Sequence, residues 1–283
     1  MTTSIFPIHL KALAGKATEW FNNPDTSPPR VDRVLPSFVM LPPPPVPVSA
    51  EYGQVEAVEI RRQMRQGGQR PVLCRCDDGA EYVVKPFSSG GSWPLILEWI
   101  CARLGRAMRL PIPNYRLVLV SEDFAEAWNV TGGRTLEPGI GFGSQFVSSA
   151  VECDEVLIKK LDPEAKTQLI AFDWWIRNTD RIHKNPNLLW DHGQHAHFLI
   201  DHEKAANTGD SLTFWQDHLA AKHMPWMTPA IIESMKRAAL LLPEIQREMP
   251  SEWTMNTDGL DWFVTQLTQS ISDTPTKEWR TNE

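Results

Sequence analysis

Residues 172–201 read FDWWIRNTDRIHKNPNLLWDHGQHAHFLID, and this stretch decides the fold that we expect. It begins inside a run from Ala165 to Ile176 that is too apolar for a surface helix, so we predict a buried central helix there. The helix ends before Asn178–Arg181, which places Asp180 on a loop, and Asn185 follows five residues later. The sequence thus places a carboxylate and an amide on one loop at the end of a buried helix.

Two short predicted strands follow this loop, from Leu188 to Trp190 and from His197 to Ile200. A hairpin of these strands would fold Asp201, which ends the second strand, back beside Asn185. Phosphoryl transfer needs a carboxylate that orients or deprotonates the attacking hydroxyl, and an amide oxygen and a second carboxylate that hold magnesium against the phosphates. Asp180, Asn185 and Asp201 are residues of these types.

The preceding part of the chain has the pattern of a sheet with one helix. Pro71 to Cys76 is a predicted strand, Asp77–Gly79 a hairpin turn and Glu81 to Lys85 the returning strand. Trp93 to Met108 has apolar residues at helical spacing and predicts a helix, and Tyr115 to Val120 predicts a further strand. This order predicts an α+β fold.

Lys85 ends an apolar strand, and Glu98 lies in the helix that follows. A lysine on a strand, held by a glutamate on a helix, can reach the α- and β-phosphates of a nucleotide. Each residue alone is more often a solvated surface charge. The informative feature is their order along the chain, because Lys85 and Glu98 precede Asp180, Asn185 and Asp201.

Other segments are assigned more coarsely. Val55 to Gln66 is predicted as a helix or a strand, and Gln145 to Ser148, after a glycine-dense stretch, as a strand and as the hinge whose backbone groups would face adenine. Two or three helices are expected to finish the chain, from Ala230 to Leu242 and from Leu260 to Ile271.

Residues 1–50 differ in composition from the rest. Pro42–Pro45 is a run of four prolines, which favours an extended polyproline II spacer over a helix or a central strand. We predict a Pro-rich N-terminal extension over residues 1–50, and a docking partner could bind through it.

The chain of 283 residues has 35 acidic against 28 basic residues, and its net charge is -7. Nucleic-acid-binding proteins usually present a basic face, so nucleic acid is not an expected partner. We find no apolar run of about 18 residues and no recognisable signal peptide, so we expect no contact with a membrane. Four unevenly spaced cysteines indicate a reducing compartment. We therefore expect a cytoplasmic protein.

Two further motifs have side chains suited to binding a ligand, but a purely structural role can also explain them. Asp191, His192, His195 and His197 have metal-ligand side chains, but exposed histidines on a hairpin explain them more simply than a zinc site does. Ser88–Ser92 could contact phosphate or could form a flexible loop before the helix, and the sequence favours neither interpretation.

The sequence resembles the HipA-like kinases, distant relatives of the protein kinases and phosphoinositide kinases. The resemblance spans residues 55 to about 205. The matching stretches are Gly67–Pro71, Asp78–Gly79 with Tyr82–Lys85, Glu98 with Leu110–Pro113, Asn178–Arg181 with Asn185–Leu189, and Ile200–His202.

This resemblance implies a bilobal, protein-kinase-like fold with ATP and Mg²⁺ in the cleft. Residues 51–148 would form a small β-rich N-lobe with one key helix, and residues 149–283 a mostly helical C-lobe. The resemblance also implies a role for each site residue: Lys85 contacts phosphate, Glu98 orients Lys85, Asp180 is the catalytic aspartate, Asn185 and Asp201 bind magnesium, and Gly67, Gly68 and Gln69 form the loop that covers the phosphates.

The function that follows is an ATP-dependent phosphotransferase, acting as a serine/threonine kinase on a protein substrate or on itself. The alternative is a catalytically weak or inactive nucleotide-binding regulatory module, a pseudokinase on the same fold. Two departures from the family pattern motivate it: the glycine turn Gly67–Gly68 is short, and Ile182 stands where relatives often have histidine, with His183 following. A kinase for small molecules or lipids is a third class, although no basic membrane surface is evident.

Overall fold

A computed structural model describes residues 53–64, 71–131, 135–209, 217–221, 227–255 and 258–272. All of these residues belong to one compact unit, Pro44–Glu283. The Pro-rich extension over residues 1–50 and the turn Gly67–Gly68–Gln69 lie outside the described residues, so what the sequence predicts for them stays a prediction.

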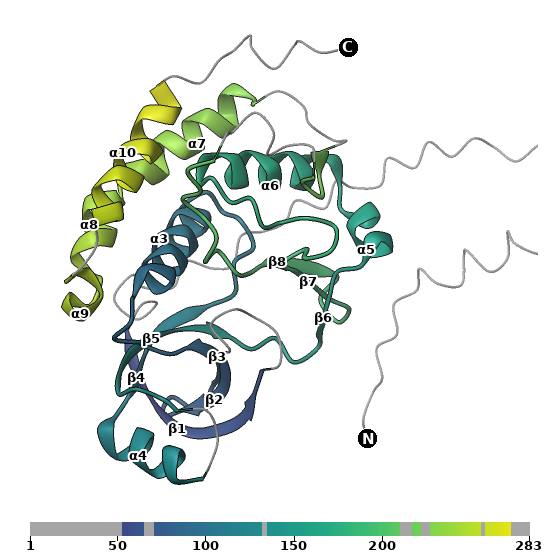
Figure 1. The fold of residues 1–283 in the computed structure, drawn as a ribbon. Coiled ribbons are helices and arrows are strands. Elements are labelled where there is room, and N and C mark those ends of the chain that lie inside the picture. Colours follow the sequence, from purple (N-terminus) through teal and green to yellow (C-terminus); the bar gives the residue numbers. More distant parts are fainter. Residues whose placement is uncertain are drawn as a thin grey trace, which may run out of the picture. The chain divides into compact units, whose positions relative to one another are not determined.

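Five strands form a closed barrel, drawn in the lower part of Figure 1. They are β1 (Gln54–Gln63), β2 (Val72–Cys76), β3 (Glu81–Lys85), β4 (Tyr115–Val120) and β5 (Gly139–Gln145). Their order around the barrel is β1-β2-β3-β5-β4, and the parallel pairing of β1 with β4 closes it. The open choice between helix and strand for Val55 to Gln66 is thereby settled as a strand as far as Gln63, and residues 65–66 lie outside the described residues.

Side chains that alternate between buried and exposed along the strands fill the barrel interior. In β1, Val55 and Ala57 are buried whereas Glu56 and Val58 are exposed, as expected for a strand whose side chains point to opposite faces in turn. The buried interior side chains are Val55, Ala57, Val72, Cys74, Cys76, Tyr82, Val84 and Val118. Cys74 and Cys76 are free thiols on one face of β2, and burial raises the pKa of each to about 12, so they serve as packing residues.

The sequence prediction for β5 was wrong in its position. The strand is the glycine-dense stretch itself and ends at Gln145, whereas Phe146–Ser148 is not a strand. The glycines are needed because β5 packs tightly: a Cβ on Gly141 would lie 2.5 Å from the carbonyl oxygen of Lys85, and one on Gly143 would lie 2.5 Å from Cγ2 of Val118.

A second sheet has the order β6-β7-β8, with β6 (Ala150–Glu152), β7 (Leu188–Asp191) and β8 (Ala196–Leu199). Strands β7 and β8 form the predicted hairpin. Asp191 closes its turn, because Oδ1 accepts hydrogen bonds from the backbone N–H groups of Gly193 at 2.7 Å and Gln194 at 3.2 Å. Asp191 therefore has a structural role in this turn.

Eight helices accompany these sheets in the part of the chain that the structure describes. They are α3 (Trp93–Ala107), α4 (Glu122–Val130), α5 (Glu155–Lys160), α6 (Pro163–Trp175), α7 (Pro229–Ala239), α8 (Leu242–Arg247), α9 (Ser251–Thr254) and α10 (Asp258–Ser272). The mixed α+β class is confirmed. The single helix predicted from Ala230 to Leu242 was wrong at its end, since α7 stops at Ala239 and α8 restarts with Pro243 in its first turn.

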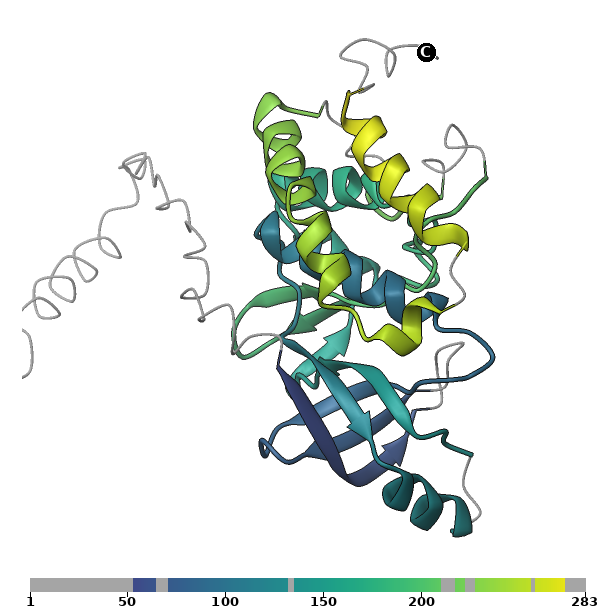
Figure 2. The same cartoon turned by 90° about the vertical axis from the view of Figure 1, so that its left-hand side faces the viewer.

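Helix α3 lies between the barrel and the C-terminal helices, as Figure 2 shows from the side. All its residues from Leu95 to Gly105 are buried. The indole N–H of Trp99 donates to the carbonyl oxygen of Ile245 at 3.1 Å, and that of Trp253 donates to the carbonyl oxygen of Ile140 at 2.7 Å. The first bond fixes α3, and with it Glu98, to α8, and the second fixes α9 to β5. Among the described helices, none is both long and apolar enough for a membrane span.

Candidate active site

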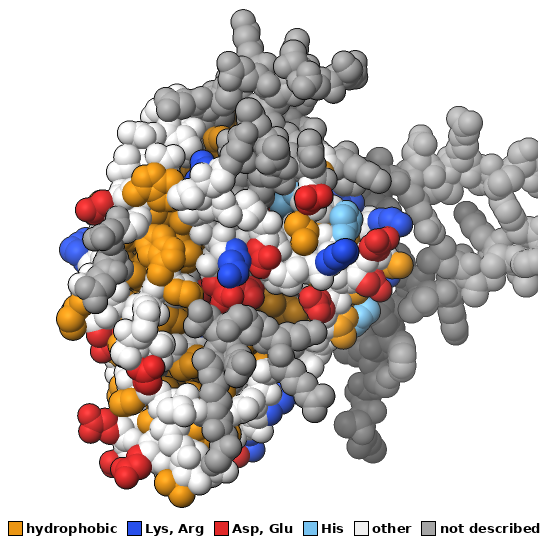
Figure 3. Space-filling view, in the orientation of Figure 1, with side chains coloured by type: hydrophobic (Ala, Val, Ile, Leu, Met, Phe, Trp, Pro, Cys, Tyr) orange, Lys and Arg blue, Asp and Glu red, His pale blue; other side chains and the backbone are white. Residues whose placement is uncertain are grey.

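The predicted polar residues line one cavity of about 680 Å³. This volume lies within the range of small-molecule binding sites. Its polar lining includes Lys85, Glu98, Asp180, Asn185, Asn187, Asp201, His202 and Glu203. In the space-filling view of Figure 3, acidic side chains gather beside a basic one near the middle of the face, where Figure 1 has the junction between the barrel and the helices. Every predicted site residue that the structure describes therefore lines one cavity.

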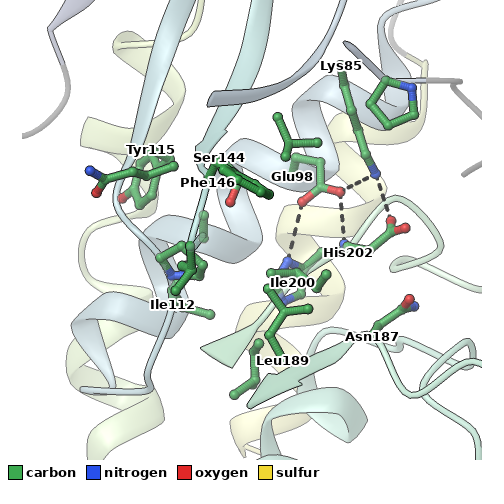
Figure 4. A pocket seen from close by; sticks show the side chains of 18 of the residues that line it. Lys85, Glu98, Ile112, Tyr115, Ser144, Phe146, Asn187, Leu189, Ile200 and His202 are labelled. Atoms are coloured by element: carbon green, nitrogen blue, oxygen red, sulfur yellow. Dashed lines mark hydrogen bonds and ion pairs between the residues drawn. The ribbon is translucent and has the colours of Figure 1, made fainter. Parts of the chain in front are cut away.

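Lys85 and Glu98 form a buried ion pair. The Nζ of Lys85, at the end of β3, donates to Oε1 of Glu98, on α3, at 2.6 Å (Figure 4). Burial alone would lower the pKa of Lys85, but the carboxylates around it outweigh burial and raise the pKa. Burial would likewise raise the pKa of Glu98, and Lys85 and His202 instead lower it. Both groups are therefore charged at neutral pH.

Two more carboxylates share the same ammonium. Lys85 Nζ donates to Oδ1 of Asp201 at 2.7 Å and to Oε2 of Glu203 at 2.8 Å. The pKa of Asp201 is raised by its burial, against the attraction of Lys85, and the nearby Glu98 and Glu203 raise it further. Three carboxylates thus face one ammonium, which leaves an excess of negative charge beside Asp201.

Backbone geometry places Asp201 in this cluster. Its φ is 58°, in the left-handed region where aspartate and asparagine are enriched among non-glycine residues. The chain therefore turns sharply after β8: the Asp201 side chain meets Lys85, and the next N–H, that of His202, donates to Oε1 of Glu98 at 3.0 Å. The His202 ring packs edge-on against Phe172 of α6, with ring centroids 5.9 Å apart. His202 thereby connects α3, α6 and the turn at Asp201.

The loop after α6 positions Asp180. Oδ2 of Asp180 accepts hydrogen bonds from Nδ2 of Asn185 at 2.8 Å and from Nδ2 of Asn187 at 3.2 Å. Because each amide uses its nitrogen here, both amide oxygens stay available, and no described donor contacts either of them. The sequence favoured Asn185 over Asn187 for metal binding, and the structure brings both asparagines to Asp180.

A buried ion pair under this loop was missed by sequence reasoning. Arg181 Nε donates to Oδ2 of Asp173 at 2.6 Å, His218 Nε2 lies 3.0 Å from the same oxygen, and Asn178 Nδ2 donates to Oδ1 at 3.0 Å. Burial alone would raise the pKa of Asp173, but Arg181 and His218 outweigh it and lower the pKa to about 2. The sequence did hold a signal for Asp173, which is an aspartate inside an otherwise apolar helix. No feature of the sequence marked His218 as its partner.

The other half of the cavity is apolar. Figure 4 shows Ile112, Tyr115, Phe146 and Leu189 on the side away from Lys85. Phe146, Val147 and Ser148 follow β5 and line the cavity, so the segment predicted as the hinge borders it. The N–H of Phe146 donates to the carbonyl oxygen of Glu81 at 2.8 Å, whereas no described acceptor takes the N–H of Val147.

Oxygen donors for a metal ion are available at one end of the cavity. The part of the chain that the structure describes has no group of three or more His, Cys, Asp or Glu residues arranged for a metal. Magnesium is usually held by one or two carboxylates together with substrate phosphates and water, so it needs no such group. The carboxylate of Asp201 and the amide oxygens of Asn185 and Asn187 fit this requirement, and the excess negative charge around Lys85 favours a cation.

The ends of the predicted phosphate-covering loop also lie at the cavity. Met64 and Pro71 flank residues 65–70, and both line the cavity. The N–H of Met64 donates to the carbonyl oxygen of Pro71 at 2.9 Å, so the two flanks are joined. The assignment of Gly67, Gly68 and Gln69 to the phosphates stays a prediction.

Comparison with known proteins agrees with the resemblance seen in the sequence. A family model described as HipA-like kinase matches residues 57–282. No curated protein matches the chain. The crystal structure of CtkA, a proinflammatory kinase from Helicobacter pylori, is similar at 12% sequence identity and a TM-score of 0.49, over 78% of this chain and 94% of that one. Since the family model spans most of its length, the chain belongs to the HipA-like kinase family and is a kinase-type phosphotransferase.

Proposed function

We propose that this protein transfers the γ-phosphoryl group of ATP to a serine or threonine hydroxyl of a protein, either a separate substrate or itself. The observation that carries the proposal is the convergence of Lys85, Glu98, Asp180, Asn185 and Asp201 on one cavity from separate segments of the chain. Their side chains are the types that phosphoryl transfer uses for positioning and charge stabilisation.

The two halves of the cavity match the two halves of ATP. The apolar side, with Ile112, Tyr115 and Leu189, suits the adenine ring, and the N–H of Val147 is a donor for a ring nitrogen. Lys85 lies at the polar side, where its ammonium would contact the phosphates. Glu98 keeps Lys85 charged and in place, which supports this role.

Magnesium, when bound, neutralises charge on the phosphates and on the leaving group. Asp201 would hold it through a carboxylate oxygen and Asn185 through its amide oxygen. Both residues are pre-positioned, Asp201 by Lys85 and by its left-handed turn and Asn185 by its bond to Asp180.

Asp180 would act on the acceptor hydroxyl. Its Oδ2 is held by Asn185 and Asn187, while no described donor contacts Oδ1, so Oδ1 can accept the hydroxyl proton. The hydroxyl oxygen then forms a bond to the γ-phosphorus, the bond from that phosphorus to the bridging oxygen of ADP breaks, and the proton stays on Asp180. The acceptor class itself is an expectation from the family resemblance.

The variant Asp180→Asn tests this proposal. It removes the proton acceptor but keeps the shape of the side chain, so we expect ATP binding in calorimetry with magnesium and a loss of radiolabelled transfer of about 100-fold or more. Transfer at the wild-type rate by Asp180→Asn would overturn the catalytic assignment. Binding of ATP by the wild type without transfer to any protein, including itself, would instead indicate a regulatory nucleotide-binding module.

A further inference from the structure

Lys85 has no free hydrogen-bond donor in this structure. An ammonium group has three N–H donors. Glu98, Asp201 and Glu203 accept one hydrogen bond each, at 2.6, 2.7 and 2.8 Å. A phosphate oxygen can therefore reach Lys85 as an acceptor only if one of the three carboxylates gives up its bond.

The three carboxylates differ in what else holds them. Glu98 also accepts a hydrogen bond from the backbone N–H of His202, and its other oxygen lies 3.4 Å from the His202 ring. Asp201 has Lys85 as its single described donor, but it is the proposed magnesium ligand and its backbone is held in a left-handed turn. Glu203 has Lys85 as its single hydrogen-bond donor among the described residues. Glu203 has neither a second described donor, as Glu98 has, nor a proposed role at the metal, as Asp201 has, so it is the carboxylate that can leave Lys85 without disturbing either.

We propose that Glu203 sets the affinity for ATP by competing with the phosphates for Lys85, an inference that rests on the proposed function. A carboxylate and a phosphate oxygen are both anionic acceptors that make charge-assisted hydrogen bonds with an ammonium. Glu203 belongs to the same chain and is largely buried at 6% side-chain exposure, so it competes at a high effective concentration. Binding of the phosphates has to displace it, and the displacement weakens the observed affinity.

The test compares Glu203→Gln and Glu203→Ala with the wild type in calorimetric titrations of the full chain with ATP and magnesium. We expect the Kd for ATP to fall about tenfold in Glu203→Ala, because one charge-assisted hydrogen bond no longer has to be broken, and to fall less in Glu203→Gln. Adenosine has no phosphate, so its Kd should not change. Thermal unfolding of each variant without nucleotide checks that the fold is retained.

A matched control removes a negative charge from the same cavity without touching Lys85. Glu152, on β6, lines the cavity, is exposed, and makes no described ion pair. Glu152→Gln should change the Kd for ATP much less than Glu203→Gln does. Equal effects of the two substitutions would show that net charge, and not the bond to Lys85, sets the affinity.

Other outcomes separate this inference from the function on which it rests. An unchanged Kd for ATP in both Glu203 variants, with normal binding by the wild type, would overturn the competition alone. A raised Kd that depends on magnesium would overturn it too and would assign Glu203 to the metal. A wild type and variants that bind no ATP at all would overturn both the inference and the proposed function.

Discussion

Arg181 and Asp173 form an ion pair of 2.6 Å in which neither side chain is exposed to solvent. Arg181 also donates to backbone carbonyl oxygens of Asn187 and Ile200, so one guanidinium connects the loop that carries Asp180 with the residue before Asp201. The buried guanidinium of Arg181 therefore holds the two proposed catalytic segments together. Removal of the Asp173 carboxylate would leave the charge of Arg181 buried without an ion-pair partner.

We predict that Asp173→Asn lowers the free energy of unfolding by about 3–5 kcal/mol, the usual loss when one partner of a buried ion pair is removed. Urea unfolding followed by circular dichroism measures it. Glu233→Gln is the control, because the Arg237–Glu233 pair is 3.7 Å long and its side chains are 64% and 58% exposed. It should change stability very little. Equal losses in the two variants would contradict the role given to Asp173.

The low pKa of Asp173 predicts how this stabilisation depends on pH. The pKa is about 2 in the folded protein and 3.8 ordinarily, so the folded state favours the charged carboxylate. A carboxyl group whose pKa is lowered by folding stabilises the protein fully above its ordinary pKa. This stabilisation is lost as the pH falls through the pKa of the folded protein. The stability difference between wild type and Asp173→Asn should shrink by about 2 kcal/mol between about pH 5 and pH 2. A difference that stays constant over this range would contradict the assignment.

The close packing of β5 predicts a penalty for a single methyl group. In Gly143→Ala, the new Cβ would lie 2.5 Å from Cγ2 of Val118 and 3.2 Å from Cβ of Tyr82, and both neighbours are buried. We expect a loss of about 1–3 kcal/mol, as for other overpacked cores. Gly53→Ala is the control, because no atom of the described residues lies within 4 Å of the added atom. A urea midpoint for Gly143→Ala equal to that of the control would show that the barrel relaxes around the methyl group.

The sequence was informative where a residue type and its neighbours in the chain carry the signal. The strand that ends at Lys85, the helix with Glu98 and the hairpin before Asp201 follow from local periodicity and turn chemistry, and the structure has all three. Closure of the barrel depends instead on the parallel pairing of β1 with β4. No local pattern encodes a pairing between strands so far apart in the chain.

The parts of the site that sequence reasoning missed depend on contacts across the fold. Glu203 meets Lys85 across 118 positions of the chain, and His218 meets Asp173 across 45. A glutamate and a histidine in polar segments look like ordinary surface residues until packing buries them. The glycines of β5 were not predicted to lie in a strand for the same reason, because the need for glycine comes from the close approach of Lys85 and Val118 across the sheet.

The roles of the two asparagines beside Asp180 are separable by the magnesium dependence of phosphate transfer. Both donate to Oδ2 of Asp180, but the spacing in the sequence favours Asn185 as the metal ligand. We predict that Asn185→Ala raises the magnesium concentration for half-maximal transfer about tenfold or more, as loss of a ligand weakens a metal site at least as much as loss of an outer-shell partner. Asn187→Ala is the control: it removes the longer hydrogen bond to Asp180 and should lower the rate at saturating magnesium while the magnesium requirement stays close to that of the wild type. The reverse pattern, a shifted requirement in Asn187→Ala and none in Asn185→Ala, would transfer the ligand role to Asn187.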